Sequence, residues 1–503
     1  MASLSRESPV PSVPAGGRAG RVGRRRLARA TGLLVAGAVV GVEGLLAGCA
    51  TSPAATPSAA KPTVASNKVT LYYSAGGYES TRSAASLQAV QELLQTHFLA
   101  KHPSLDLRVN WNYHGDSSGL ISAMIAGAAP DVFEEWQPST LLKHGAYCLD
   151  LSPYIRKANL NLAQFLPGEL ETFRTTNGEG VLGQWGLPAY VHQMAMAVNL
   201  DVLDSLGLAY PSPQWDWQEA EALWKGATKR DTNPAQGRTG GAFLWFGGGP
   251  MSFYLHGWGA SYVDPADTTR CVVDSPQAVS FGDWHFGLLQ SGAATLNNSR
   301  SGFAKGQLVC AIRGTDGGLA PSVVAWRGTK WRFYPMPTWP RGKFTACYSD
   351  FHGIWSGTKH PDASWELVQF LSTDLNWQRG LMHLYLNGPA LKALWPEWAA
   401  TVVQVAPPLK DKNVEVFVQQ VQDNMPMYHN YFEYDTVGAF GIISSWMNRI
   451  LNRKATVRGG FAAAAQQTNA FEAALKSVAP ARSQAAKAFP STGPGIAKVP
   501  AGL

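Results

Sequence analysis

Three short apolar segments alternate with two helical patterns early in the chain, and this alternation limits the fold more than any other feature. The apolar segments are rich in β-branched and aromatic residues, which favours strands. Between them, apolar residues recur at helical spacing, as at Leu87, Val90 and Leu94. We therefore predict strands over 68–73, 105–111 and 131–133, and helices over 83–100 and 120–126.

A strand–helix–strand–helix–strand series implies a parallel sheet with right-handed crossovers, and hence an α/β protein. Such sheets bind ligands beyond the carboxyl ends of their strands. The loops over 74–82 and 134–139 follow the first and third predicted strands. We therefore expect both loops to contribute to a binding site.

The first 48 residues have the features of an export signal and not of a folded segment. A basic segment over 24–29 precedes an apolar run over 33–46, which is short for a membrane span. The run ends in Leu-Ala-Gly-Cys at Cys49, which resembles the bacterial lipobox. That resemblance implies a diacylglycerol on Cys49 and a mature chain anchored at the outer face of the cytoplasmic membrane. The arginine-rich start also resembles a twin-arginine signal, and the export route stays open.

Removing the export signal changes the charge of the working protein. The whole chain has a formal net charge of +7, but residues 1–48 hold seven Arg and two Glu, which leaves about +2. No later segment contains a dense run of Lys and Arg. A nucleic-acid partner is therefore not expected.

Two low-complexity segments bracket the folded region. Residues 50–66 are rich in Ala, Pro, Ser and Thr, which is typical of a flexible linker, and 479–503 form a similar tail. Roughly 410 residues lie between them, more than one hydrophobic core usually serves. We therefore expect two lobes, and we find no internal repeat.

A series of short motifs resembles the extracellular solute-binding proteins of sugar importers. Each motif is weak alone, but they follow the family's order through most of 68–390. The segments are 128–132, 149–154, 183–188, 196–201, 206–208, 213–217, 303–306, 309–312, 335–337, 353–356 and 359–370. The chain departs from the family at Trp258, where a second glycine is common, and 391–478 is recognisable only as helical.

The resemblance implies a two-lobed, periplasmic-binding-protein-like (Venus flytrap) fold, in which each lobe is a mainly parallel sheet flanked by helices. We expect crossings between the lobes near 187–188, within 341–348 and within 372–389, and closure of the lobes on a solute by a hinge. The expected division is lobe 1 over 67–187 with 345–385, and lobe 2 over 188–344 with 386–478.

No motif supports catalysis. The segment 178–183 matches a dinucleotide-binding fingerprint letter for letter, but no hydrophobic strand precedes it, so we predict a hairpin turn. Phosphate-binding, zinc-protease and nucleophile-elbow motifs are absent from the sequence. Acidic residues leave a glycosidase open as an alternative: Glu134 and Glu135, with Asp350, Glu433 or Asp435 as a partner. We predict a binding protein, without a catalytic residue or a cofactor.

Aromatic side chains are the positive chemical signal for a sugar site. Sugars stack on aromatic rings and need fixed polar partners for their hydroxyl groups. The 18 tryptophans exceed what a core of this size needs. The resemblance places ligand contacts at Trp136 and Trp258, which we expect on opposite sides of the solute. The full predicted site is Tyr73, Tyr78, Arg82, Glu135, Trp136, Tyr190, Gln193, Trp245, Trp258, Arg313, Tyr348, Asp350 and Trp355.

Metal binding is not predicted. His192 and His352 have no second ligand at a suitable spacing. The four later cysteines, Cys148, Cys271, Cys310 and Cys347, lack zinc-type pairs, and they either form disulfides or stay buried and free.

The sequence therefore predicts a monomeric, lipid-anchored receptor. It captures a sugar or oligosaccharide and presents it to the permease of an ABC transporter. Two alternatives stay open: a secreted carbohydrate-active enzyme such as a glycosidase or lyase, and a receptor for another solute such as glycerol phosphate or a polyamine.

Overall fold

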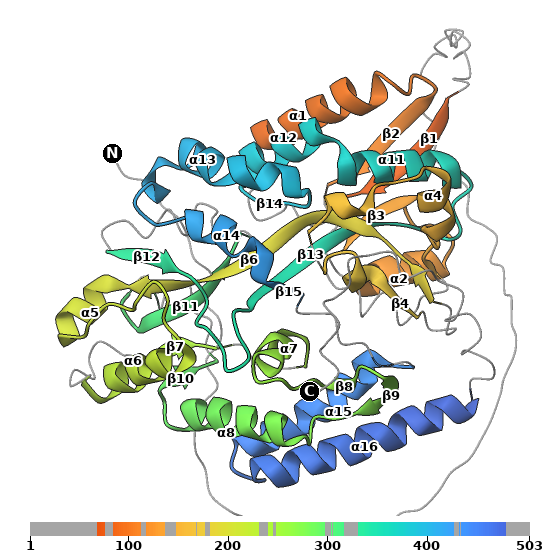
Figure 1. The fold of residues 1–503 in the computed structure, drawn as a ribbon. Coiled ribbons are helices and arrows are strands. Elements are labelled where there is room, and N and C mark those ends of the chain that lie inside the picture. Colours follow the sequence, from red (N-terminus) through yellow and green to blue (C-terminus); the bar gives the residue numbers. More distant parts are fainter. Residues whose placement is uncertain are drawn as a thin grey trace, which may run out of the picture. The chain divides into compact units, whose positions relative to one another are not determined.

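One mixed β-sheet runs through the part of the chain that the computed structural model describes (Figure 1). Its strands follow the order β10-β7-β11-β6-β13-β3-β1-β2, and β12 and β14 pair with β6 while β15 pairs with β13. The strands of this sheet are β1 (Val69–Ser74), β2 (Leu105–Asn110), β3 (Val132–Glu135), β6 (Leu187–Asn199), β7 (Gly240–Phe243), β10 (Ala294–Thr295), β11 (Leu308–Gly314), β12 (Trp331–Tyr334), β13 (Thr345–Ile354), β14 (Gly388–Pro389) and β15 (Asn424–Pro426).

The structure describes residues 68–75, 84–111, 117–135, 147–166, 168–176, 182–230, 240–244, 248–296, 303, 305–315, 330–426, 432 and 434–478. They all belong to the unit Ser66–Leu503. The α-helices are α1 (Ala84–Leu93), α2 (Ser117–Ile125), α4 (Ser152–Lys157), α5 (Leu200–Leu206), α6 (Trp217–Arg230), α7 (Gly248–Gly257), α8 (Pro276–Gln290), α11 (Pro361–Thr373), α12 (Leu375–Tyr385), α13 (Trp395–Val405), α14 (Glu415–Gln419), α15 (Thr436–Leu451) and α16 (Val457–Val478).

The predicted strand–helix series at the start of the chain is confirmed. β1 pairs in parallel with both β2 and β3, as the crossover rule requires. The helix predicted over 83–100 begins as α1 and continues as a π-helix, η2 (Leu94–Leu99). Val90, Leu94 and Phe98 are buried against the sheet, as their spacing indicates.

Two long strands connect the two ends of this sheet. The first part of β6 pairs with β13 and β14, and its last part pairs with β11 and β12. All residues of β6 are buried, because both of its faces are covered. β13 runs antiparallel to β6 and to β3, and parallel pairing occurs toward the two edges of the sheet and between β13 and β15.

The hairpin predicted around 178–183 is confirmed by the strands on either side of it. β4 (Arg174–Thr176) and β5 (Leu182–Gln184) pair antiparallel, and 177–181 lie outside the described residues. A dinucleotide-binding turn would instead open a helix.

Tryptophans contribute heavily to the core. Trp215, Trp224, Trp377, Trp395 and Trp398 are among the largest fully buried side chains. The surplus of tryptophan in the sequence is therefore explained in large part by packing. Cys148, Cys271, Cys310 and Cys347 are also buried, and none forms a disulfide.

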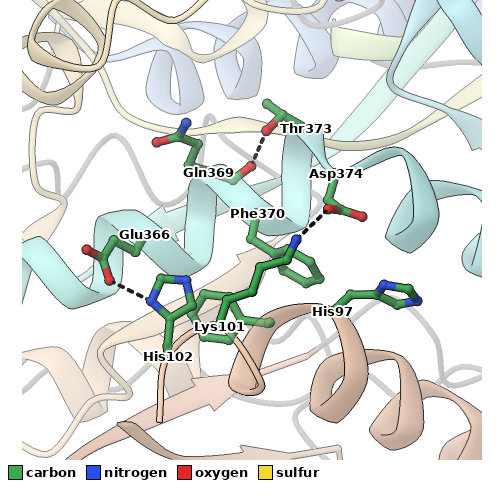
Figure 2. Close-up of a pocket in the computed structure, with 9 residues that line it drawn as sticks. His97, Lys101, His102, Glu366, Gln369, Phe370, Thr373 and Asp374 are labelled. Carbon is green, nitrogen blue, oxygen red and sulfur yellow. Dashed lines mark hydrogen bonds and ion pairs between the residues drawn. The ribbon is translucent and has the colours of Figure 1, made fainter. Parts of the chain in front are cut away.

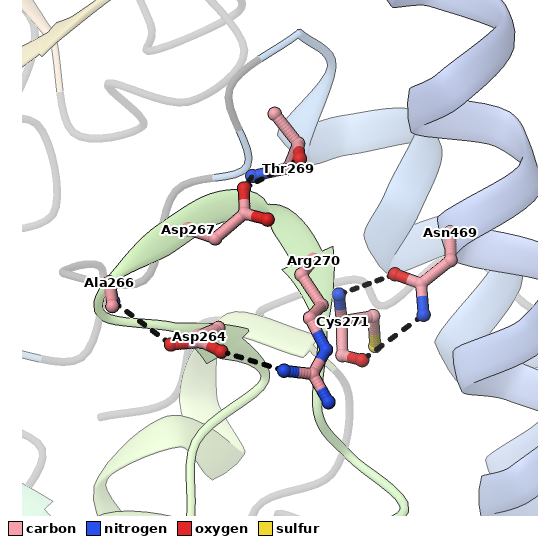
Figure 3. A network of polar contacts seen from close by, with 7 residues as sticks. All are labelled: Asp264, Ala266, Asp267, Thr269, Arg270, Cys271 and Asn469. Carbon is pink, nitrogen blue, oxygen red and sulfur yellow. Dashed lines mark hydrogen bonds and ion pairs between the residues drawn. The ribbon is translucent and has the colours of Figure 1, made fainter.

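A second hairpin, β8 (Val263–Asp264) with β9 (Asp267–Cys271), is held by helix α16 (Figure 3). The side-chain amide of Asn469 accepts a hydrogen bond from the backbone N–H of Cys271 at 2.6 Å and donates one to its carbonyl at 3.3 Å. Arg270 and Asp264 pair across the hairpin at 3.2 Å. One side chain thus satisfies both backbone groups at the end of β9.

Candidate functional site

Five buried polar side chains meet where β1, β3, β6 and β13 lie side by side. We call Tyr73, Glu134, Tyr190, His192 and Asp350 the buried polar network; each is at most 7% exposed. The Tyr190 hydroxyl lies 2.8 Å from Oε1 of Glu134 and 2.5 Å from Oδ2 of Asp350. The Tyr73 hydroxyl donates to Oε2 of Glu134 at 3.2 Å, and Nε2 of His192 lies 3.4 Å from Oδ1 of Asp350.

Strand register brings these residues together. Asp350 lies opposite Tyr190 and Tyr348 lies opposite His192, so their side chains share one face of the β6–β13 pair. A register shift follows between Asp350 and Phe351. These contacts join residues up to 160 positions apart, and secondary structure alone does not reveal them.

The network reaches the surface at one end. The rings of His192 and Tyr348 lie 4.4 Å apart between centroids, and Tyr348 is partly exposed. His192 is 7% exposed, whereas Glu134 is fully buried. A solute that reaches this network therefore meets an aromatic ring and an imidazole before the carboxyl groups.

A separate buried acid, Glu169, contacts Cys347 and Ser349 of β13. Glu169 accepts hydrogen bonds from the Ser349 hydroxyl and, at 3.1 Å, from the Cys347 thiol. Burial is the main cause that raises the pKa of Glu169 to about 8, and the charge of Glu171 adds to this rise. The hydrogen bond from Cys347 and the charge of His192 lower the pKa and so oppose the rise. Glu169 is therefore mostly protonated at neutral pH.

Gln193 and Arg313 do not share the face of the network. Successive strand residues point to opposite faces, and Gln193 pairs with Cys347 while Arg313 pairs with Ala195. Gln193 is fully buried, and its side-chain amide has no hydrogen-bond partner among the described residues. Arg313 donates to the carbonyl of Ile312 at 3.0 Å.

Glu135 is buried on the other face of β3 from Glu134, as adjacent strand positions require. After burial, the charge of Glu135 is the second cause that raises the pKa of Cys148 to about 12. Glu135 therefore lies near Cys148, whereas Glu134 contacts the two tyrosines.

Trp258 and Trp355 lie in other clusters. Trp258 is 7% exposed and packs among Trp217, Trp284 and Trp339, with ring centroids 4.6 to 5.7 Å apart. Trp355 is partly buried beside the cluster around Phe133. Their contact with a solute stays a prediction, and this packing gives Trp258 a structural role of its own.

The structure thus brings three predicted residues, Tyr73, Tyr190 and Asp350, into one network, with Tyr348 at its edge through His192. The prediction missed Glu134 as a site residue and considered His192 only as a metal ligand. The remaining predicted residues lie outside the described residues: Cys49, Tyr78, Arg82, Trp136 and Trp245.

His352 pairs with Glu134 in the strand register and faces the Tyr73 ring at 5.9 Å. Burial lowers the pKa of His352 to about 3, so this imidazole is neutral. Within the described ranges, no group of three His, Cys, Asp or Glu side chains is arranged to hold a metal ion.

A surface pocket of about 340 Å³ lies away from the network, between η2 and α11 (Figure 2). His102 pairs with Glu366 at 3.1 Å, and Lys101 approaches Asp374 at 3.9 Å across it. None of the predicted site residues lines this pocket. Its charges are largely paired with one another, which leaves little to attract a ligand.

None of the helices described combines the length and hydropathy that a membrane crossing requires. No curated protein sequence matches the chain. Solved structures with the same fold do exist. An ABC substrate-binding protein from Listeria monocytogenes in complex with cycloalternan is 17% identical, with a TM-score of 0.64 over 81% of this chain and 99% of that one.

Two further structures agree. The sugar-binding protein MalE from Xanthomonas citri is 17% identical, with a TM-score of 0.63 over 82% of this chain and 99% of that one. A cyclic alpha-maltosyl-1,6-maltose binding protein from Arthrobacter globiformis is 16% identical, with a TM-score of 0.60 over 80% and 99%. These likenesses show a two-lobed, periplasmic-binding-protein-like α/β fold, as predicted.

The family model described as bacterial extracellular solute-binding protein matches residues 80–374, more than half of the 503 residues. This match begins after β1 and contains all of β2, β3, β6 and β13, and therefore four residues of the buried polar network. The chain belongs to the family of bacterial extracellular solute-binding proteins.

Proposed function

We propose that this chain is a lipid-anchored receptor that captures a carbohydrate between its two lobes and delivers it to the permease of an ABC transporter. The observation that carries the proposal is the buried polar network on the strands that both parts of the sheet share. Hydroxyl-rich ligands need polar partners that are already fixed in position. Tyr190 and Tyr73 fix the Glu134 carboxyl group in this way.

A neutral solute fits these charges better than an ionic one. An anionic solute such as glycerol phosphate calls for several cationic contacts, and the network contains two acids and one histidine. A polyamine calls for several available carboxylates, but those of Glu134 and Asp350 already bond to Tyr190. The Listeria, Xanthomonas and Arthrobacter proteins, which share the fold, carry sugar names or sugar ligands.

The proposed lobe division follows the strands that cross the sheet. Lobe 1 comprises 67–187 with 345–385, and lobe 2 comprises 188–344 with 386–478. The switch of β6 from β13 to β11 supports a crossing within this strand. In this proposal Tyr78, Arg82, Trp136, Trp245, Trp258 and Trp355 complete the site.

Calorimetric titration of the purified chain with a panel of mono- and oligosaccharides tests the proposal. We expect one sugar to bind stoichiometrically and to be recovered unchanged after prolonged incubation. His192→Ala should weaken binding at least tenfold, because it removes the polar group at the accessible end of the network. The matched control is His383→Ala, which changes an exposed histidine on α12.

Either of two outcomes would contradict the proposal and support another function. Turnover of a sugar that is lost in Asp350→Asn would instead identify a carbohydrate-active enzyme. Binding of a polyamine or of glycerol phosphate, with none of any sugar, would identify a receptor for another class of solute.

A further inference from the structure

One tyrosine hydroxyl bridges two buried carboxyl groups where β3, β6 and β13 meet. Tyr190 contacts Glu134 at 2.8 Å and Asp350 at 2.5 Å, and none of the three side chains is more than 4% exposed. The contact with Glu134 has a typical O–H···O distance, and the contact with Asp350 is shorter than a normal hydrogen bond. The hydroxyl oxygen therefore has a carboxyl oxygen within hydrogen-bond distance on each side.

These two hydrogen bonds need two protons. A phenol hydroxyl carries one hydrogen and can donate it to one carboxyl oxygen only. If both acids were ionised, the second contact would place lone pairs of two oxygens against each other in a buried site, where repulsion is strongest. The second proton must therefore come from one of the carboxyl groups.

The contacts of the second Glu134 oxygen, Oε2, indicate which carboxyl group accepts hydrogen bonds and which one donates. It accepts from the Tyr73 hydroxyl at 3.2 Å, so both oxygens of Glu134 face a tyrosine donor. This arrangement suits an ionised carboxylate. With Glu134 as the acceptor on both sides, the remaining hydrogen bond of the bridge has its proton between Oδ2 of Asp350 and the Tyr190 oxygen. Consecutive hydrogen bonds of this kind polarise and strengthen one another.

We propose that Glu134 and Asp350 share one exchangeable proton through Tyr190, and that this proton holds β3 and β13 to β6. The bridge adds side-chain hydrogen bonds to the backbone pairing of β3 with β13 and of β13 with β6 at this point. Without this proton, two carboxylates would surround one hydroxyl in a buried site, which weakens the junction.

Among the described residues, further titratable groups around the bridge come from several elements packed on it. β6 contributes His192, β3 contributes Glu135, and β1 contributes Tyr73. β13 itself contributes Tyr348 and His352. The acids of α11, which packs on β13, are exposed. Of these groups, His192 approaches Asp350, at 3.4 Å, on the oxygen that does not contact Tyr190.

Infrared spectroscopy of the solute-free chain tests the shared proton independently of any solute. Glu169 carries its own proton, so the parent for this experiment is Glu169→Gln. Its difference spectrum against the double variant with Asp350→Asn should show the carbonyl stretch of one protonated carboxyl group. The same band should be lost with Glu134→Gln, because a single remaining carboxylate can accept from Tyr190 without a further proton.

The control is Tyr73→Phe, which removes a donor to Glu134 but leaves the bridge and should retain the band. Asparagine can donate from its amide to the Tyr190 oxygen, so Asp350→Asn should remain folded. A carboxylic-acid band of equal strength in the parent and both amide variants would overturn the proposal. If one amide variant fails to fold, the other gives the same comparison.

Discussion

At the scale of single residues, Glu169 makes stability depend on pH in a defined direction. Burial is the main cause that raises its pKa from 4.5 to about 8. A group with a raised pKa contributes stability that is fully present below its unfolded-state value and is lost as the pH rises through the folded-state value. The contribution of Glu169 therefore declines between about pH 4.5 and about pH 8.

We expect Glu169→Gln to flatten this decline. The amide cannot lose a proton, so the melting temperature of the variant should fall less than that of the parent between pH 5 and pH 8.5, as measured by circular dichroism. Glu92→Gln, on an exposed face of α1, is the control and should follow the parent. Equal slopes for all three proteins would show that Glu169 is ionised throughout.

Substitution of Trp258 can test its role in packing and its proposed role in ligand binding separately. Its ring is buried among Trp217, Trp284 and Trp339, so Trp258→Ala should lower the free energy of unfolding by about 3 to 5 kcal/mol in denaturant titration. Sugar affinity, measured below the melting temperature, tests the ligand contact separately. Trp284→Ala is the matched control for packing alone. Equal affinity in both variants and in the parent would remove Trp258 from the proposed site.

The sequence predicted only some members of the buried polar network. Tyr73 was included in the predicted site because it ends a strand that the sequence shows clearly, and Asp350 because its carboxylate can accept hydrogen bonds from hydroxyl groups. Glu134 was missed because its partner, Tyr190, is 56 residues away, and their contact depends on strand register. Tertiary pairing sets that register, and a single sequence does not contain it.

At the scale of elements, local pattern predicted β1, β2, β3, α1 and the start of α2 to within a few residues. The change of the first helix from α to π at Leu94 was not predicted, because its apolar spacing suits an α-helix and a π-helix alike. β6 was predicted only as a crossing near 187–188. Its small and polar residues hide the periodicity of a strand, and burial on both faces removes any alternation.

We expect Asn469 to stabilise the contact between helix α16 and the β8–β9 hairpin. Asn469→Ala leaves the backbone N–H and carbonyl of Cys271 without their side-chain partner. We expect a loss of about 1 to 3 kcal/mol in the free energy of unfolding, measured by urea titration. Ser477→Ala, on an exposed turn of the same helix, is the control. A loss below the error of the titration would mean that water replaces the amide at no cost.

At the scale of the whole molecule, the sheet explains how one chain supplies both lobes. β6 and β13 belong to neither edge, and their residues form most of the buried polar network. A solute bound there contacts strands that both parts of the sheet share. In the proposed function, we expect small changes of angle in these strands to couple binding to closure, which is the usual behaviour of hinged binding proteins.

The last prediction concerns the proposed lipid anchor at Cys49, which lies outside the described residues. A receptor that serves a permease works best where it is held at the membrane surface, since tethering raises its effective concentration there. Leu-Ala-Gly-Cys ends the apolar run at Cys49, so lipidation of this cysteine should supply the tether.

Expressed in a host that processes lipoproteins, the parent should fractionate with membranes, and Cys49→Ala should lose the diacylglycerol and its cleavage site. Cys148→Ala, which changes a buried cysteine of the folded region, is the control and should stay in the membrane fraction. Mass spectrometry of the parent should show a mature chain that begins with a modified Cys49. An unmodified Cys49 inside a longer chain would refute the anchor and leave the carbohydrate site untouched, because the two rest on separate parts of the sequence.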